Sequence, residues 1–133
     1  GDCNAAAFWY DLAARREPGS EYGPLYQGIC AAGDAEKRAL FQQVIGLNPA
    51  NDRGYYWMGI TEERSGDCAA AIPWFLHALE RNNQVVPTRL ALARCYEQTG
   101  AAEFAAGEYR AILVLQPDYR AALQALERLE GRP

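Results

Sequence analysis

The chain has 133 residues, of which 50% are apolar and 23% are charged, the composition of a globular domain or short array and not of a disordered segment. Its net charge is −4, and its 13 basic residues are scattered among 17 acidic ones without forming a basic stripe, which excludes a typical nucleic-acid-binding surface. No apolar run approaches the roughly 18–20 residues that a membrane-spanning helix needs. We therefore expect no nucleic-acid partner and no direct membrane span, while the oligomeric state stays undetermined.

Prolines and glycines divide the chain into segments of helical length. The interval from Pro49 to Pro117 is twice that from Gly66 to Gly100, which indicates a regular period along the chain. Apolar positions between these breakers recur at helical spacings, and no segment alternates as a strand would. Asp34 and Asp67 each follow a glycine directly before a helical pattern, and we expect them to act as N-caps. In chain order, the predicted helices cover about residues 3–16, 22–32, 34–47, 52–64, 67–82, 87–99, 102–115 and 119–130.

A near-duplication links the first residues of the chain to a stretch in its middle. Residues 1–10 read GDCNAAAFWY, and residues 66–75 read GDCAAAIPWF. A second cysteine follows each copy at the same interval, so that the four cysteines form two equally spaced pairs, Cys3 with Cys30 and Cys68 with Cys95. An internal repeat of this kind indicates an array of stacked helical hairpins.

In a frame whose period is about 34 residues, the sequence resembles the tetratricopeptide repeat (TPR) family. Counted from Asp52, the small and aromatic residues typical of that family stand at positions 8, 20, 24 and 27, occupied by Gly59, Ala71, Phe75 and Ala78. The resemblance implies an all-α fold, a right-handed α-α superhelix (solenoid) of about three helical hairpins. A single TPR-like domain would span residues 1–133, with a half-repeat at 1–18, repeats at 21–49, 52–85 and 86–118, and a capping helix at 119–130.

The resemblance also implies a concave groove, lined by the first helix of each repeat. Rings interleaved with arginines at such positions suit a peptide-binding surface, because rings bury apolar area at low entropic cost and guanidinium groups pair with carboxylates. The residues expected in this groove are Tyr22, Tyr26, Arg53, Tyr56, Trp57, Ile60, Arg64 and Arg94. An alternative interpretation places Tyr56 or Trp57 in the core between repeats.

The four cysteines have three possible interpretations. In the repeat frame Cys68 begins a second helix and Cys95 ends the next first helix, so that the two sulfurs meet if neighbouring helices are antiparallel. We expect two disulfides, Cys3–Cys30 and Cys68–Cys95, which would place the protein outside the reducing cytosol, in the bacterial periplasm or secreted. Four buried thiols in a cytoplasmic protein are the second possibility, and a single zinc site is the third.

No motif predicts catalysis, and we expect no enzyme activity, no cofactor and no metal site. The single histidine, His77, is expected at the surface, and Trp9 and Trp74 are expected to pack against neighbouring helices rather than mark a second contact surface. The favoured function is a non-enzymatic protein-interaction module of an extracytoplasmic assembly. The alternative is a scaffold, spacer or docking segment of a larger protein, possibly one whose catalytic domain lies elsewhere.

Overall fold

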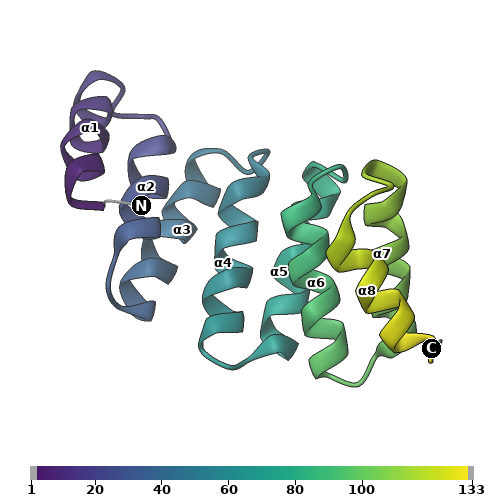
Figure 1. Ribbon diagram of the computed structural model, residues 1–133. Helices are drawn as coiled ribbons and strands as arrows, with labels where there is room; N and C mark the ends of the chain where they lie inside the picture. The colour runs from purple at the N-terminus through teal and green to yellow at the C-terminus, as the bar shows by residue number, and fades with distance from the viewer. Residues whose placement is uncertain (1–2, 132–133) are drawn as a thin grey trace.

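The computed structural model describes residues 3–131, and over this range the chain is a row of antiparallel helices (Figure 1). The described residues contain no strand, and each helix packs mainly on those before and after it. The helices are α1 (Cys3–Arg16), α2 (Tyr22–Cys30), α3 (Asp34–Leu47), α4 (Asp52–Arg64), α5 (Cys68–Arg81), α6 (Val86–Gln98), α7 (Ala102–Leu115) and α8 (Arg120–Leu129). The predicted all-α superhelix of helical hairpins is confirmed, while the division into repeats at 21–49, 52–85 and 86–118 stays a prediction.

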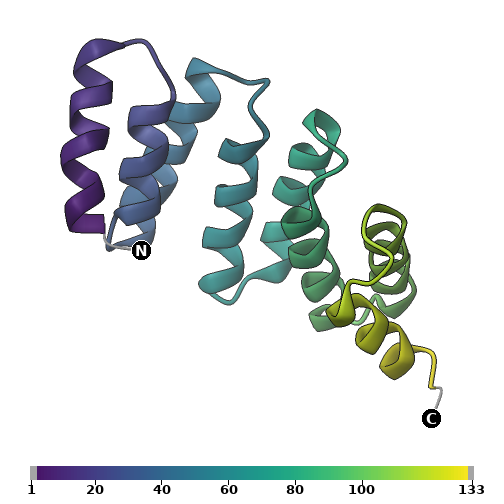
Figure 2. The ribbon, with the colours of Figure 1, turned by 45° about the horizontal axis from the view of Figure 1, so that its top comes forward.

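The row of helices is curved. When the top of the molecule is turned forward, α7 and α8 are rotated away from the direction of α1 and α2 (Figure 2). Besides their sequence neighbours, α2 contacts α4 and α4 contacts α6, so these three helices lie next to one another along the row. Together they form one surface, which we call the α2–α4–α6 face.

The breaks between helices follow the turn residues. Gly66 and Gly100, which stand at equivalent turns, adopt φ values of +91° and +83°, a left-handed conformation that favours glycine. Asp67 caps α5 as predicted, because its side chain accepts a hydrogen bond from the Ala70 N–H at 2.9 Å. The prediction for Asp34 is wrong: this residue lies inside the first turn of α3, after Gly33, and makes no side-chain cap.

A glycine facing a phenylalanine allows close packing in two successive hairpins. Gly28 of α2 lies against the ring of Phe41 in α3, and Gly59 of α4 lies against the ring of Phe75 in α5. A Cβ atom at Gly59 would come within 2.5 Å of the Phe75 ring, which is fully buried. The absence of a side chain at these two glycines is therefore what allows the paired helices to approach so closely.

The N-terminal helix is covered on one side only. Among the other helices, α1 packs on α2, and its aromatic residues Phe8 and Trp9 are 66% and 65% exposed. The expectation that Trp9 packs against a neighbouring helix is therefore wrong, because no described helix covers this face of α1. Trp74, its counterpart in α5, does pack against the core cluster that contains Phe41 and Met58.

Candidate functional site

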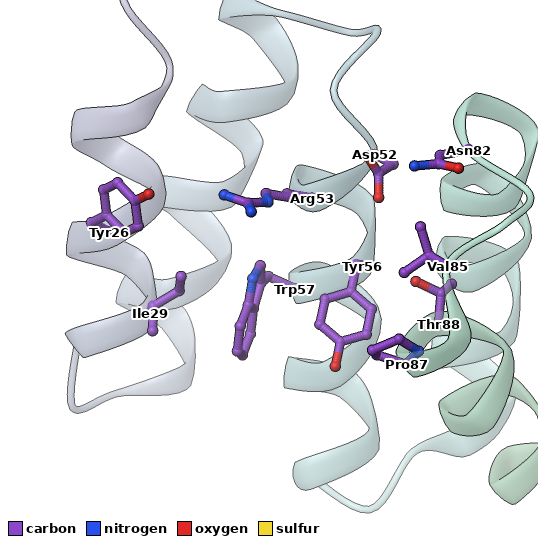
Figure 3. Close-up of a pocket in the computed structure, with 10 residues that line it drawn as sticks. All are labelled: Tyr26, Ile29, Asp52, Arg53, Tyr56, Trp57, Asn82, Val85, Pro87 and Thr88. Carbon is purple, nitrogen blue, oxygen red and sulfur yellow. The ribbon is translucent and has the colours of Figure 1, made fainter. Parts of the chain in front are cut away.

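A pocket of about 590 Å³ opens on the α2–α4–α6 face (Figure 3). Its volume lies within the range of about 300–1,000 Å³ that is usual for ligand sites. It is bounded by α2, by α4, by the connection between α5 and α6, and by the first turn of α6. The lining residues are Tyr26, Ile29, Asp52, Arg53, Tyr56, Trp57, Asn82, Val85, Pro87 and Thr88.

Four of the residues predicted for the groove meet in this pocket: Tyr26, Arg53, Tyr56 and Trp57. The ring centroids of Tyr56 and Trp57 are 5.2 Å apart in an edge-to-face arrangement. Both side chains are partly buried and also pack against the core cluster around Phe75. Burial raises the pKa of Tyr56, since the phenolate form would lose its hydration. These two rings therefore belong to the core on one side and to the pocket on the other.

Arg53 is the cation of the pocket. The Asn51 side chain caps α4 by accepting a hydrogen bond from the backbone N–H of Arg53 at 3.0 Å, which fixes the start of the helix. The guanidinium itself is exposed and has no ion-pair partner among residues 3–131. It extends from α4 toward Tyr26 on α2 (Figure 3). An unpaired arginine next to partly buried rings is suited to bind a carboxylate.

The other four predicted groove residues do not line the pocket. Ile60 is only 7% exposed and lies in the core cluster with Phe75, so its expected place in the groove is corrected. Tyr22 borders a different hollow between α1 and α2, although its ring stacks on Tyr26 with centroids 6.5 Å apart. Arg64 is exposed at the last turn of α4, outside the lining residues.

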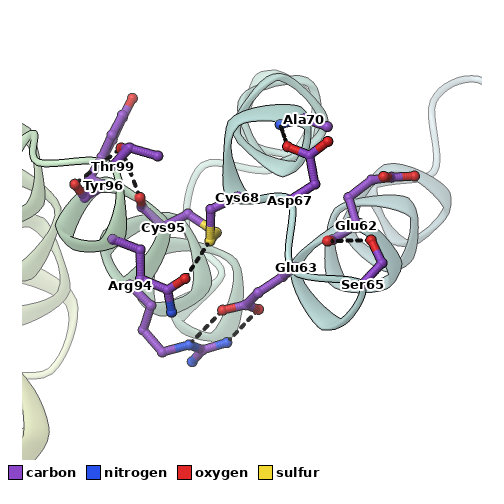
Figure 4. Close-up of a disulfide and its surroundings, with 11 residues drawn as sticks. Glu62, Glu63, Ser65, Asp67, Cys68, Ala70, Arg94, Cys95, Tyr96 and Thr99 are labelled. Atoms are coloured by element: carbon purple, nitrogen blue, oxygen red, sulfur yellow. Dashed lines mark hydrogen bonds and ion pairs between the residues drawn. A yellow bond between two sulfur atoms is a disulfide. The ribbon is translucent and has the colours of Figure 1, made fainter.

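Arg94 is held in an ion pair. Its guanidinium donates two hydrogen bonds of 3.0 Å to the carboxylate of Glu63, which joins α6 to α4 (Figure 4). The same arrangement recurs at the equivalent positions further along the chain, where Arg128 of α8 donates to Glu97 of α6. This recurrence indicates that Arg94 stabilises the junction between neighbouring hairpins and is not a free binding group.

Besides Ile29 on α2, five further residues of the pocket wall are not among the groove residues named from the sequence. Asp52, Asn82, Val85, Pro87 and Thr88 come from the start of α4, from the α5–α6 connection and from the start of α6. The groove positions taken from the family resemblance lie within first helices and omit the connections between repeats. Asp52 is the first residue of α4 and Thr88 the third residue of α6, so the two do not share a repeat position that could have identified them.

The two cysteine pairs lie at disulfide distance. The Cα atoms of Cys3 and Cys30 are 5.5 Å apart and those of Cys68 and Cys95 are 5.0 Å apart, within the range of disulfide-bonded cysteines. The first pair lies between α1 and α2, and the second between α5 and α6 (Figure 4). Because the pairs occupy separate junctions, the four cysteines do not converge on one zinc site.

His77 and the second cysteine pair are the other groups that could carry chemistry, and each already has a neighbouring partner. The His77 side chain is half exposed on α5, as predicted, with its Nδ1 3.6 Å from a Glu80 oxygen. Around the second pair, a Glu63 oxygen lies within 4.8 Å of both sulfurs, but this carboxylate is already bound by Arg94.

Within residues 3–131, no helix has the length and apolar character required to cross a bilayer.

Comparison with known proteins finds similarity in structure but not in sequence. Neither a profile of a known protein family nor a curated protein sequence matches the chain. The structure of MamA superposes with a TM-score of 0.81 at 19% identity, covering 99% of this chain and 80% of that one. YrrB, described as a TPR protein with an unusual peptide-binding site, gives 0.74 at 16% identity, covering 98% and 69%.

A structure with a bound peptide is also similar. The first TPR of Spaghetti (RPAP3) bound to the HSP90 peptide SRMEEVD superposes with a TM-score of 0.68 at 16% identity, covering 74% of this chain and 80% of that one. At these identities the comparisons establish the fold alone. The chain has a TPR-like fold, a superhelix of helical hairpins.

Proposed function

We propose that the chain is a non-enzymatic interaction module that binds an extended peptide, or an extended segment of a partner protein, in the pocket of the α2–α4–α6 face. The observation that carries this proposal is the pocket itself, in which two partly buried rings, Tyr56 and Trp57, lie beside the unpaired Arg53. Rings and arginine are the side chains that contribute most of the binding energy at protein interfaces. Two of the structurally similar proteins are described with a peptide or a peptide-binding site, which is consistent with this function.

Binding to a library of peptides tests the proposal. A phage-displayed library of short random peptides is selected on the immobilised chain, and the enriched clones are then assayed on two variants. We expect Arg53→Glu to lose most of the binding, because the substitution places a carboxylate in a pocket that already contains Asp52. Arg120→Glu, which makes the same charge change at an exposed site on α8, is the matched control and should retain binding. Equal binding by both variants would contradict the proposal.

We further propose that the module works in an extracytoplasmic assembly, with disulfides Cys3–Cys30 and Cys68–Cys95 formed. The support is that both pairs lie at disulfide distance at equivalent helix junctions. Disulfides persist in oxidising compartments and are rare in the cytosol. Alkylation of free thiols at the moment of cell lysis, followed by mass spectrometry, tests this: the proposal predicts no alkylated cysteine, and alkylation of all four would contradict it.

A second candidate function is a docking segment within a larger assembly, favoured by the exposed ring pair on α1. Phe8 and Trp9 are in edge-to-face contact, with centroids 5.3 Å apart, and present their apolar surface to solvent. Exposed apolar patches of this kind mark contact surfaces. If docking through α1 is the main function, Trp9→Ser should abolish assembly while Arg53→Glu leaves it intact.

A further inference from the structure

The pocket has two sides of opposite charge. Arg53 extends over the α2 side, next to Tyr26, whereas Asp52 lies on the other side and faces Asn82 at the end of α5 (Figure 3). The carboxylate of Asp52, like the guanidinium of Arg53, has no ion-pair partner among the described residues. Tyr56 and Trp57 lie one helical turn further along α4, with Trp57 on the Arg53 side and Tyr56 on the Asp52 side (Figure 3). An extended ligand that crosses α4 over these rings therefore has a cationic group beside its α2 end and an anionic group beside its α6 end.

Thr88 provides a polar group inside the pocket. Its side chain is 1% exposed, and its Oγ1 has no hydrogen-bond partner among residues 3–131. The hydroxyl points from the first turn of α6 toward α4 and Tyr56 (Figure 3). A buried hydroxyl without a partner destabilises the protein, and a ligand that hydrogen-bonds to it relieves that cost. A peptide backbone, with its N–H and C=O groups, is the natural partner for such a hydroxyl.

We propose that the pocket recognises an extended peptide in which an acidic residue stands next to a large apolar residue, in either order along the peptide. The residue on the other side of the apolar residue is not acidic. The carboxylate pairs with Arg53, the apolar side chain packs on Tyr56 and Trp57, and the backbone hydrogen-bonds to the Thr88 hydroxyl. Asp52 repels a second acidic residue and favours a neutral or basic one. This inference rests on the proposed function and specifies the chemistry of its ligand.

Three blocked hexapeptides test the charge requirement. The parent is Gly-Ser-Asp-Phe-Lys-Gly, and the two others replace its aspartate by asparagine or its phenylalanine by alanine. Dissociation constants come from NMR titration of the isotope-labelled chain, which also locates the site through shift changes at Tyr56 and Trp57. We expect the asparagine peptide to bind about fivefold more weakly than the parent, the effect of one exposed ion pair. With Arg53→Gln the difference between the two peptides should vanish, and with Arg120→Gln it should persist.

The outcomes separate this inference from the proposed function. Equal binding of the aspartate and asparagine peptides, with shifts at Tyr56 and Trp57, overturns the charge assignment and leaves peptide binding in the pocket intact. Absence of shifts at both residues with all three peptides overturns the proposed function as well.

Thr88→Val tests the hydroxyl independently, because valine has nearly the same shape. We expect this variant to bind the parent peptide about tenfold more weakly, the effect of one lost hydrogen bond. Its urea midpoint should equal or exceed that of the wild type, since the substitution removes a buried hydroxyl that has no partner among the described residues. A lowered midpoint with unchanged binding would assign the hydroxyl to folding and overturn its role in recognition.

Discussion

Gly59→Ala is expected to destabilise the chain although alanine is the better helix former. In a helix interior this exchange ordinarily gains about 1 kcal/mol, from lower backbone entropy in the unfolded chain. Here the new Cβ would lie 2.5 Å from one carbon of the Phe75 ring and 2.6 Å from another, where 3.4 Å marks the start of ordinary contact. Phe75 is fully buried, so its ring has to move by about 1 Å against a close-packed core.

The magnitude follows from comparing the two effects. Overpacking of a core by one methyl group costs about 1–3 kcal/mol. Set against the helix-propensity gain of about 1 kcal/mol, the free energy of unfolding should fall by about 1 kcal/mol, and by no more than about 2 kcal/mol. Gly107→Ala is the matched control, because its Cβ in α7 would meet nothing within 4 Å. This variant should be more stable than the wild type by about 0.5–1 kcal/mol.

Urea unfolding monitored by circular dichroism measures both variants. The double variant Gly59→Ala with Phe75→Leu gives an additional check, because a smaller side chain opposite the alanine should recover part of the loss beyond what the two single changes predict. If Gly59→Ala raises the midpoint as much as Gly107→Ala does, the close approach of α4 and α5 does not depend on the glycine, and the account of the hairpin core is refuted.

Four further predictions concern one disulfide, two residues of the junction network, and the exposed ring of α1. Replacing Cys68 and Cys95 by serine should lower the free energy of unfolding, measured by urea unfolding, by about 3 kcal/mol. If a dithiol reductant leaves the stability of the wild type unchanged, no disulfide contributes to that stability and the prediction is wrong. Burial and the hydrogen bond to Glu97 raise the pKa of Tyr109 to about 12, from 10.0. Because the unfolded chain then loses this proton at lower pH than the folded one, stability should fall as pH rises from about 10 to 12, and Tyr109→Phe should make that slope shallower in thermal melts. The hydrogen bond from Arg128 lowers the pKa of Glu97, so its contribution to stability should be lost as pH falls below about 4.5, and Glu97→Gln should flatten the acid limb of the same profile. Trp9→Ser should leave the free energy of unfolding within about 0.5 kcal/mol of the wild type, since 65% of this side chain is already in water, and a large loss would show that α1 is packed more tightly than described.

The helices and their order could be predicted because local chemistry determines them. Asn48-Pro49 and Gln116-Pro117 end α3 and α7 close to the expected residues, since the residue before a proline avoids helical backbone. The C-terminal end of α2 was predicted less well, because the backbone conformation of one residue ends this helix early. Ala31 adopts an extended conformation, with φ −65° and ψ 146°, so that α2 ends at Cys30 and does not continue to Ala32 as expected.

The residues expected in the groove differ in where the structure places them. Tyr56 and Trp57 line the pocket and also pack against the core. Ile60 and Arg94 contact a neighbouring helix instead: Ile60 packs in the core cluster with Leu92, and Arg94 pairs with Glu63 on α4. Contacts between such distant parts of the sequence depend on how the helices stack, which periodicity within one helix does not encode.

We propose that the chain binds its partner in the pocket between α2, α4 and the start of α6. Hydrogen–deuterium exchange of the intact chain, with and without a saturating phage-selected peptide, tests it most directly. We expect added protection in α2, in the first half of α4 and around Val85–Thr88, with α1 and α8 unchanged. Protection confined to α1 around Phe8 and Trp9, with none in α4, would contradict it.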